Sequence, residues 1–175
     1  RGEQVRVVDN FATGFERNLE SVADKVDLRR LDIGAEHAAL REAVEGVDYI
    51  LHQAALNSVP RSINNPIASN EANVTGTLNL LVAARDAGVK RVVYASSSSA
   101  YGDTLTLPKV ETMGTAPLSP YALQKLVGEQ YCQMFTRLYG LETVTIRYFN
   151  VFGPRQDPSS PYSGVISLFI SALCE

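Results

Sequence analysis

The chain has 175 residues, enough for one compact domain, and it is 45% hydrophobic, 20% charged and 8% aromatic. This composition excludes a disordered tail, a collagen-like fibre and a coiled coil. The formal net charge of −3 comes from 16 basic and 19 acidic residues, and it offers no electrostatic footprint for nucleic acid or an anionic membrane surface. We therefore expect a globular protein with neither kind of partner.

The sequence also lacks signals for export or metal binding. The longest apolar stretch, residues 164–173, is interrupted by serine and is too short to span a bilayer, and no secretory signal is visible. Two cysteines, Cys132 and Cys174, cannot form a disulfide framework, which favours a reducing compartment. No cluster of His, Cys and acidic residues has metal-site spacing. These features predict a cytoplasmic protein without a metal ion.

Short apolar runs alternate with longer helical patterns along the chain, which is typical of strand–helix units around a parallel sheet. We expect strands at residues 5–8, 26–31, 49–52, 91–95 and 143–148, all rich in Val, Ile, Leu and Tyr. Such strands are typical of a sheet that is buried on both faces. The sequence therefore predicts an α/β fold with a doubly wound parallel sheet.

Helices are expected between the strands, at residues 35–44, 66–87, 120–139 and 164–174. Pro66 and Pro120 suit a first helical turn, and Gly88 and Gly140 suit the position just after a helix. Ser119 is the expected N-cap of the third helix.

Three features of the sequence point to chemistry, and Asp9 is the first, at the end of the first expected strand. A carboxylate there can accept both ribose hydroxyls of an adenosine. A turn or capping role is the commoner one for an Asp after a strand, so both interpretations stay open.

The second feature is the pair Tyr121 and Lys125, whose four-residue spacing places both on one helix face. A nearby cation favours the phenolate and lowers the tyrosine pKa from about 10. Such a pair can exchange a proton with a substrate hydroxyl while a hydride leaves the same carbon. A solvated helix pair is the alternative.

The third feature is a run of four serines, Ser96 to Ser99, directly after the expected strand 91–95. Binding crevices of open parallel sheets lie beyond the carboxyl ends of their strands. We therefore expect one of these hydroxyls to orient a sugar alcohol, with a serine-rich turn as the alternative.

Together, Ser97 and Tyr121-x-x-x-Lys125 resemble the Ser–Tyr–Lys triad of the short-chain dehydrogenase/reductase superfamily. Three further motifs are similar to those of its extended branch, the NAD-dependent epimerase/dehydratase family that acts on nucleotide sugars: Tyr101-Gly-Asp103, Ser119-Pro-Tyr121 and Arg147-Tyr-Phe-Asn150. The resemblance extends over essentially the whole chain. It implies a Rossmann-type fold, an NAD cofactor and a catalytic set of Ser97, Tyr121 and Lys125.

The resemblance also implies a set of cofactor-binding residues in loops of the expected sheet. The adenosine would lie against Asp9, Asn10, Phe11, Asp32 and Ile33, and the rest of NAD against Gln53, Ala54, Ala55, Asn73, Tyr121, Lys125 and Tyr148. The implied substrate-binding residues are Ser58, Ser97, Ser98, Tyr121 and Asn150. A purely structural explanation remains for the small residues Ala54 and Ala55, and for Asn73 as a partner of buried backbone groups.

Dehydratases of this family carry an acidic pair after the catalytic hydroxyl, where this chain has Ser98 and Ser99. Elimination of water would therefore lack its acid and base, which favours redox-neutral 4-epimerisation. In the implied mechanism, Tyr121 takes the proton of the C4 hydroxyl, a hydride passes to NAD, and the hydride returns to the opposite face of the rotated 4-keto sugar. Ser97 positions the sugar oxygen.

The motifs around Ser58 and residues 149–158 are most similar to those of UDP-N-acetylglucosamine 4-epimerases, and also resemble those of UDP-glucose 4-epimerases. The expected partner is thus a UDP-sugar, most closely UDP-N-acetylglucosamine or UDP-N-acetylgalactosamine. The alternatives are a UDP-glucose or UDP-glucuronate 4-epimerase, a 4-reductase, and an inactive nucleotide-binding fragment. By resemblance, helices 66–87 and 120–139 would form a homodimer interface.

The glycine-rich turn that binds the pyrophosphate in this family does not occur in the 175 residues. The resemblance thus implies that residues 1–175 are a partial NAD-binding Rossmann domain that starts at the family's second strand. It would lack the first β-α unit and the C-terminal substrate lobe. In the 3-2-1-4-5-6 strand order, strands 5–8 and 49–52 would then lack their shared neighbour and expose unpaired edges.

Overall fold

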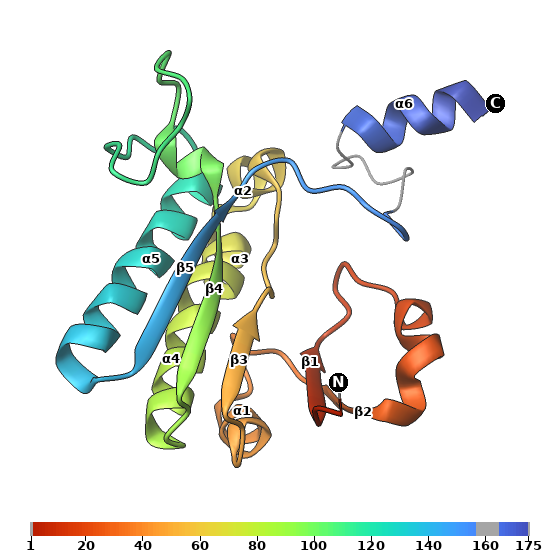
Figure 1. Cartoon of the computed structure of the whole chain (residues 1–175), viewed down its shortest axis with the longest axis vertical. Helices are drawn as coiled ribbons and strands as arrows, with labels where there is room; N and C mark the ends of the chain where they lie inside the picture. Colours follow the sequence, from red (N-terminus) through yellow and green to blue (C-terminus); the bar gives the residue numbers. More distant parts are fainter. Residues whose placement is uncertain (1, 157–164, 175) are drawn as a thin grey trace.

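The computed structural model describes residues 2–156 and 165–174, and it shows five parallel strands with helices packed against them (Figure 1). The strands are β1 (Val5–Asp9), β2 (Val26–Arg30), β3 (Tyr49–His52), β4 (Arg91–Ser97) and β5 (Glu142–Tyr148). Each lies where the apolar runs predict a strand, and the largest shift is at the end of β4, which runs two residues further, to Ser97.

The strands form two parallel sheets, β1–β2 and β3–β4–β5. In the first sheet Val5 pairs with Val26, and in the second Tyr49 pairs with Arg91 and Ser97 with Tyr148. Within the described residues, β1 and β3 are not hydrogen-bonded to each other. The unpaired edges predicted for these two strands are therefore present.

The helical segments follow the predicted order with some additions: η1 (Glu16–Lys25), α1 (His37–Val44), α2 (Val59–Asn64), α3 (Pro66–Asn70), η2 (Glu71–Thr75), α4 (Gly76–Asp86), η3 (Ser98–Tyr101), α5 (Pro120–Tyr139) and α6 (Val165–Cys174). The 3₁₀ segments η1 and η3 and the short helix α2 were not predicted. The expected helix 66–87 is confirmed as the contiguous run of α3, η2 and α4 over residues 66–86, but the π-helical turn η2 within it was not predicted. Gly164, the predicted start of the last helix, lies outside the described residues. No helix in the described ranges is long and apolar enough to cross a membrane.

The backbone N–H groups at the start of α5 have hydrogen-bond acceptors. Pro120 has no N–H, the Ser119 hydroxyl accepts from Ala122 N at 3.1 Å, and Ser62 Oγ of α2 accepts from Tyr121 N at 3.0 Å. The helix ends at Gly140, which has a φ of 73°, and this confirms the helix end that was predicted from the glycine. This capping fixes the first turn of α5, where Tyr121 lies.

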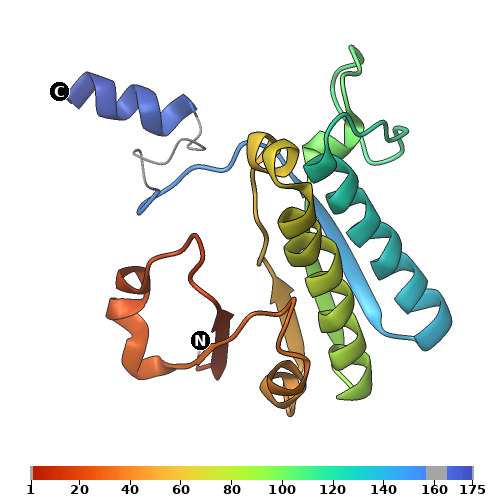
Figure 2. The same ribbon diagram turned by 180° about the vertical axis from the view of Figure 1, so that it is seen from behind.

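The main core lies between β3–β4–β5 and the helices α4 and α5, which cover the same face of the sheet (Figures 1 and 2). Leu81 of α4, Tyr94 of β4 and Phe135 of α5 belong to this core. A second core joins α1 and α4 to Leu31, directly after β2, and includes Val8 of β1 and Ile50 of β3. Both cores therefore support the strands from their helix side.

The expectation that the strands are buried on both faces is wrong for every strand except β4. Strands β1 and β2 contain no buried residue, and β3 and β5 each have an exposed face. On β3, Tyr49 is 64% and Leu51 is 70% exposed, whereas His52, on the opposite face, is buried. On β5, Val144 and Ile146 are also exposed. The physical reason is that α4 and α5 occupy only one face of this sheet (Figures 1 and 2).

Candidate active site

The predicted site residues gather at the carboxyl ends of the strands. Asp9 ends β1, Gln53 follows β3, Ser97 ends β4 and Tyr148 ends β5. Ser97 and Tyr148 are register partners, so they lie on adjacent strands. The parallel topology thus places Gln53, Ser97 and Tyr148 at the carboxyl ends of one sheet, where open α/β sheets bind ligands, and Asp9 at the corresponding end of the sheet β1–β2.

Ser97, Tyr121 and Lys125 lie close together at the end of β4. The Ser97 hydroxyl is a hydrogen-bond partner of the Tyr121 side chain, and it accepts from Ser99 Oγ at 2.8 Å. Lys125 Nζ lies 6.0 Å from the Tyr121 ring centroid and donates to Ala95 O at 2.9 Å. Lys125 is only 4% exposed. The alternative of a solvated helix pair is therefore wrong for this lysine.

Burial sets the protonation of this group. It raises the pKa of Tyr121 above its ordinary value, and the hydrogen bond with Ser97 opposes that effect. Burial also lowers the pKa of Lys125 to about 8. The expected lowering of the tyrosine pKa by Lys125 is therefore not observed in this structure, since desolvation of the phenolate has the larger effect. At neutral pH, Tyr121 is a phenol and Lys125 a cation.

An ion pair between the buried Glu129 and the half-buried Arg147, which the sequence did not predict, stabilises this region. Glu129, one turn beyond Lys125 on α5, accepts from Arg147 Nη2 of β5 at 2.7 Å and also from the hydroxyl of Ser96. The Arg147 guanidinium lies 4.6 Å from the Tyr101 ring centroid. These contacts join α5, β4, β5 and η3 directly behind Ser97. The spacing of four between Tyr121, Lys125 and Glu129 was the available sequence signal.

The adenosine-loop candidates lie together beyond β1 and β2. Asp9 Oδ1 accepts from Phe11 N at 2.7 Å, and Asn10 Nδ2 donates to Asp32 Oδ2 at 2.9 Å. Phe11 has a φ of 55°, in the left-handed region. Ile33 packs against α4 where Gly76 leaves room, because a Cβ there would lie 2.8 Å from Ile33 Cγ1. The structure therefore brings all five residues into one surface loop region, with Asp9 exposed.

The turn after β3 contains Gln53, Ala54 and Ala55, and it is tied down by Asn73. Leu56 N donates to Asn73 Oδ1 at 2.8 Å, and Asn73 Nδ2 donates to Leu56 O at 3.2 Å. Asn73 thus satisfies backbone groups, which is the structural alternative weighed from the sequence. Gln53 and Ala54 remain exposed.

The substrate candidates differ in accessibility. Ser58 is buried and caps α2, since its hydroxyl accepts from Arg61 N at 3.0 Å. Ser98 is half-buried in the first position of η3, and Asn150 is exposed two residues beyond β5. Ser98 and Asn150 are therefore the accessible members of the set, whereas the Ser58 hydroxyl has a structural role.

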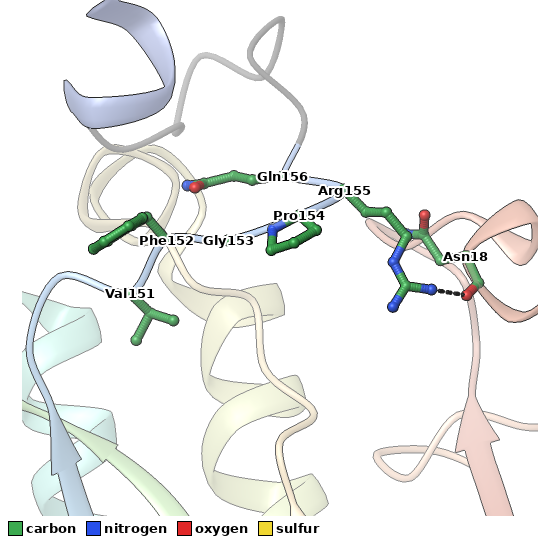
Figure 3. Close-up of a pocket in the computed structure, with 7 residues that line it drawn as sticks. All are labelled: Asn18, Val151, Phe152, Gly153, Pro154, Arg155 and Gln156. Atoms are coloured by element: carbon green, nitrogen blue, oxygen red, sulfur yellow. Dashed lines mark hydrogen bonds between the residues drawn. The ribbon is translucent and has the colours of Figure 1, made fainter. Parts of the chain in front are cut away.

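A pocket lies between the segment that follows β5 and the segment η1 (Figure 3). Asn18 and residues 151–156 line it, and Arg155 Nη1 donates to Asn18 O at 2.7 Å. This segment continues from Asn150 and carries part of the motif 149–158, of which Asp157 and Pro158 lie outside the described residues. The lining includes none of the three proposed catalytic residues.

The candidate residues fit NAD in two places, the adenosine ribose at Asp9 and the nicotinamide end near Tyr121 and Lys125. Asp9 offers an exposed carboxylate suited to ribose hydroxyls, and Lys125 and Tyr121 offer donors at the edge of the sheet beside Ser97. The glycine-rich turn that would bind the pyrophosphate is not part of the 175 residues. Among the described residues, no group of three or more His, Cys, Asp and Glu side chains is arranged to hold a metal ion.

Residues 1–175 match the NAD dependent epimerase/dehydratase family. A putative UDP-glucose 4-epimerase from Methanocaldococcus jannaschii is 40% identical over 172 residues, which cover 97% of this chain and 54% of the relative. The chain therefore spans about half the length of this relative.

Two solved structures are also similar. A UDP-N-acetylglucosamine 4-epimerase from Methanobrevibacter ruminantium, in complex with UDP-N-acetylmuramic acid, has a TM-score of 0.92 and 40% identity, over 98% of this chain and 55% of the other. A UDP-glucose 4-epimerase from Thermus thermophilus, in complex with NAD, has a TM-score of 0.84 and 38% identity, over 91% and 51%. These matches confirm the predicted α/β fold class of the Rossmann type. The division of the chain into a single partial domain stays a prediction.

Proposed function

Because the chain belongs to the NAD-dependent epimerase/dehydratase family, we propose that the protein is an enzyme that uses NAD to invert carbon 4 of a UDP-hexose through a 4-keto intermediate. The observation that carries this proposal is the meeting of Ser97, Tyr121 and Lys125 at the carboxyl end of β4. The epimerase names of the relatives described above support the same reaction class.

Each member of this group has a chemical role in the proposal. Tyr121 must first be a phenolate, which takes the proton of the C4 hydroxyl and later returns it, while Ser97 holds the same oxygen by a hydrogen bond. Burial alone keeps Tyr121 protonated. The charge of Lys125, held by Ala95 O, and the positive ring of bound NAD would favour the phenolate. Bound NAD would supply the hydride acceptor and then the hydride donor. Asp9, Asn10, Phe11, Asp32 and Ile33 would hold its adenosine, and Gln53, Ala54, Ala55, Asn73 and Tyr148 the remainder.

The surroundings of Ser97 favour epimerisation over dehydration. Ser98 and Ser99 follow it, and neither can act as a carboxylic acid or carboxylate base. Glu129, one turn beyond Lys125 on α5, is buried and paired with Arg147. An elimination would need a free acid and a free base at the sugar, so the group fits a reaction that moves one proton through Tyr121.

The proposed substrate is UDP-N-acetylglucosamine or UDP-N-acetylgalactosamine. Ser98 and Asn150 are the accessible side chains for the sugar and for the nucleotide diphosphate, respectively. The preference is tested by assays of the purified full-length protein on UDP-N-acetylglucosamine, UDP-glucose and UDP-glucuronate. A kcat/KM that is equal or higher for either of the last two would overturn the N-acetyl preference while leaving the reaction class in place.

Substitution of Tyr121 tests the reaction itself. Tyr121→Phe removes the proton acceptor, so we expect kcat to fall by about a thousandfold or more, as is usual when a general acid–base group is lost. Binding of NAD, measured by calorimetry, should persist. Tyr139→Phe, at an exposed position of the same helix, is the matched control and should retain wild-type activity.

Two results would reject the enzyme proposal in different ways. Full activity of Tyr121→Phe would show that another group moves the proton. Nucleotide binding without turnover of any UDP-hexose by the full-length wild type would favour the alternative of a nucleotide-binding module.

A further inference from the structure

Gln124 lies beside Lys125 on α5 and belongs to a buried polar cluster in which Asn73 is a proposed NAD contact, whereas Gln124 and Ser69 have no role in the proposed function. Its Oε1 accepts from Asn73 Nδ2 and from Ser69 Oγ, each at 2.8 Å. Gln124 is 5% exposed, and Asn73 and Ser69 are 1% exposed. The carboxamide oxygen of Gln124 is thus the shared acceptor of two side chains from the segment 66–75.

Asn73 also forms hydrogen bonds with the turn that follows β3. Its Oδ1 accepts from Leu56 N, and its Nδ2 donates to Leu56 O, so one amide holds both backbone groups of a single residue. The amide plane of Asn73 therefore has a fixed orientation, with its nitrogen toward Gln124. A path of hydrogen bonds joins α5, next to Lys125, to residues 53–56.

The backbone of η2 is adapted to this arrangement. Asn73 lies at the centre of the π-helical turn Glu71–Thr75, where the regular hydrogen-bond ladder of a helix is interrupted. Its carbonyl accepts from Thr77 Oγ1 at 2.7 Å, and the same oxygen of Thr77 contacts His52 Nε2 at 2.9 Å. Turns of this kind recur at functional sites because they re-aim a side chain at the cost of local helix stability.

We propose that Gln124 is a positioning residue: through Asn73 it fixes the backbone of Leu56, and with it the turn 53–56, relative to Lys125 on α5. The part of this inference that concerns NAD rests on the proposed function, because residues 53–55 are its proposed contacts. The geometric part concerns the protein alone. It states that the rigidity of this turn depends on a side chain of α5.

The chemistry of glutamine makes the proposal specific. Methionine has a similar length and shape but no strong acceptor, so Gln124→Met leaves Asn73 Nδ2 and the Ser69 hydroxyl without the oxygen that they share. Asn73 keeps its contacts with Leu56 and its 3.3 Å hydrogen bond to Ser69 Oγ, but it loses the 2.8 Å hydrogen bond that ties its amide to α5. Gln124→Glu retains an acceptor oxygen in the same place, and should therefore rescue the geometry.

Two measurements on the purified full-length protein test this inference. The first is amide hydrogen exchange at Leu56 without any ligand, and the second is the Kd for NAD. In Gln124→Met, we expect exchange at Leu56 to become roughly tenfold faster and the Kd for NAD to rise by about tenfold. A turn 53–56 that opens more often exchanges faster and is less often in the conformation that binds NAD. Gln133→Met, at an exposed position of α5, is the matched control and should change neither value.

The outcomes separate this inference from the proposed function. Unchanged exchange at Leu56 in Gln124→Met, or equally fast exchange in Gln124→Glu, overturns the positioning role. Faster exchange at Leu56 with an unchanged Kd for NAD overturns the part of the inference that links Gln124 to NAD binding. Failure of the wild type to bind NAD would instead reject the proposed function, and the exchange data on the free protein would still decide the role of Gln124. If Gln124→Met does not fold, the comparison is made with Ser69→Ala, which removes one of the two donors; unchanged exchange at Leu56 in a folded Ser69→Ala would then overturn the inference.

Discussion

His52 and Lys125 are both buried, and burial moves the pKa of each toward the neutral side chain. The pKa of Lys125 falls to about 8. That of His52 falls to about 3, first because of burial and second because of the charge on Lys125. His52 therefore stays neutral in the folded protein at every pH where the unfolded chain would begin to protonate it.

This difference predicts a loss of stability in weak acid. The pKa of His52 is lowered in the folded state, so its contribution is fully present above about pH 6.5 and is lost as the pH falls toward 3. At pH 5 we expect the free energy of unfolding to be about 2 kcal/mol lower on account of His52 alone. The variant His52→Gln, which can still donate to Thr77, should lose less between pH 7.5 and 5 in urea titrations.

The second histidine of the chain provides the control for this prediction. His37→Gln, at an exposed position of α1, should follow the wild type at both pH values. Equal losses in the wild type and in His52→Gln would show that His52 is not the group that titrates.

The residues of the site that the sequence predicted are those with a local pattern. Tyr121 and Lys125 share a helical spacing, and Ser97 ends a strand, so their proximity follows from the fold class. Gln124 and Asn73 are 51 residues apart, and Glu129 and Arg147 are 18 apart. Nothing in the local pattern of either pair indicates its partner, because the contact depends on how α5 packs on the sheet.

At the scale of elements, α5 approaches β4 closely only because it has a glycine at the contact. A Cβ on Gly128 would lie 2.2 Å from the Tyr94 hydroxyl oxygen, and Tyr94 is fully buried. The Tyr94 hydroxyl in turn donates to Lys125 O at 3.4 Å. This contact therefore sets the distance of the helix, and of the groups it carries, from the sheet.

Gly128→Ala should accordingly destabilise the protein. Helix propensity alone would favour alanine by about 1 kcal/mol. The overlap with Tyr94 should cost about 3 kcal/mol, so we expect a net loss of about 2 kcal/mol in chemical denaturation. Gly114→Ala is the matched control, because a Cβ at Gly114 meets nothing within 4 Å and the backbone there has no positive φ. An increase in stability on Gly128→Ala would mean that the helix can move away without cost.

The elements that the sequence missed are short or irregular. The pattern of residues 66–87 predicts one helix, and it gives no sign of the π turn Glu71–Thr75 within that helix. Helix α2 has six residues, too few for a hydrophobic period to be visible. Strands β3 and β4 were predictable because each is a dense apolar run, whereas β2, with the sequence VDLRR, has Val26 and Leu28 as its apolar residues.

At the scale of the whole molecule, α5 presents an apolar outer stripe that the described residues do not cover. Leu123, Val127, Met134 and Leu138 recur at the spacing of one helix face, and Leu123, Met134 and Leu138 are exposed. The opposite face of the helix packs into the main core. The proposed homodimer through helices 66–87 and 120–139 would bury this stripe against its copy.

The oligomeric state of Leu138→Glu tests this proposal. In a two-fold symmetric interface each residue appears twice, so one substitution places two carboxylates in the apolar contact. At about 2 kcal/mol for each buried contact that is lost, the dimer should weaken by about 4 kcal/mol, roughly a thousandfold in Kd. Sedimentation velocity at micromolar concentration should then show a dimer for the wild type and a monomer for Leu138→Glu.

Leu105→Glu makes the same change at a leucine that is 95% exposed and lies outside both helices, and it should leave the dimer intact. A dimer that survives Leu138→Glu would require an interface elsewhere on the molecule, and the exposed face of β3 and β5 would be the next surface to test.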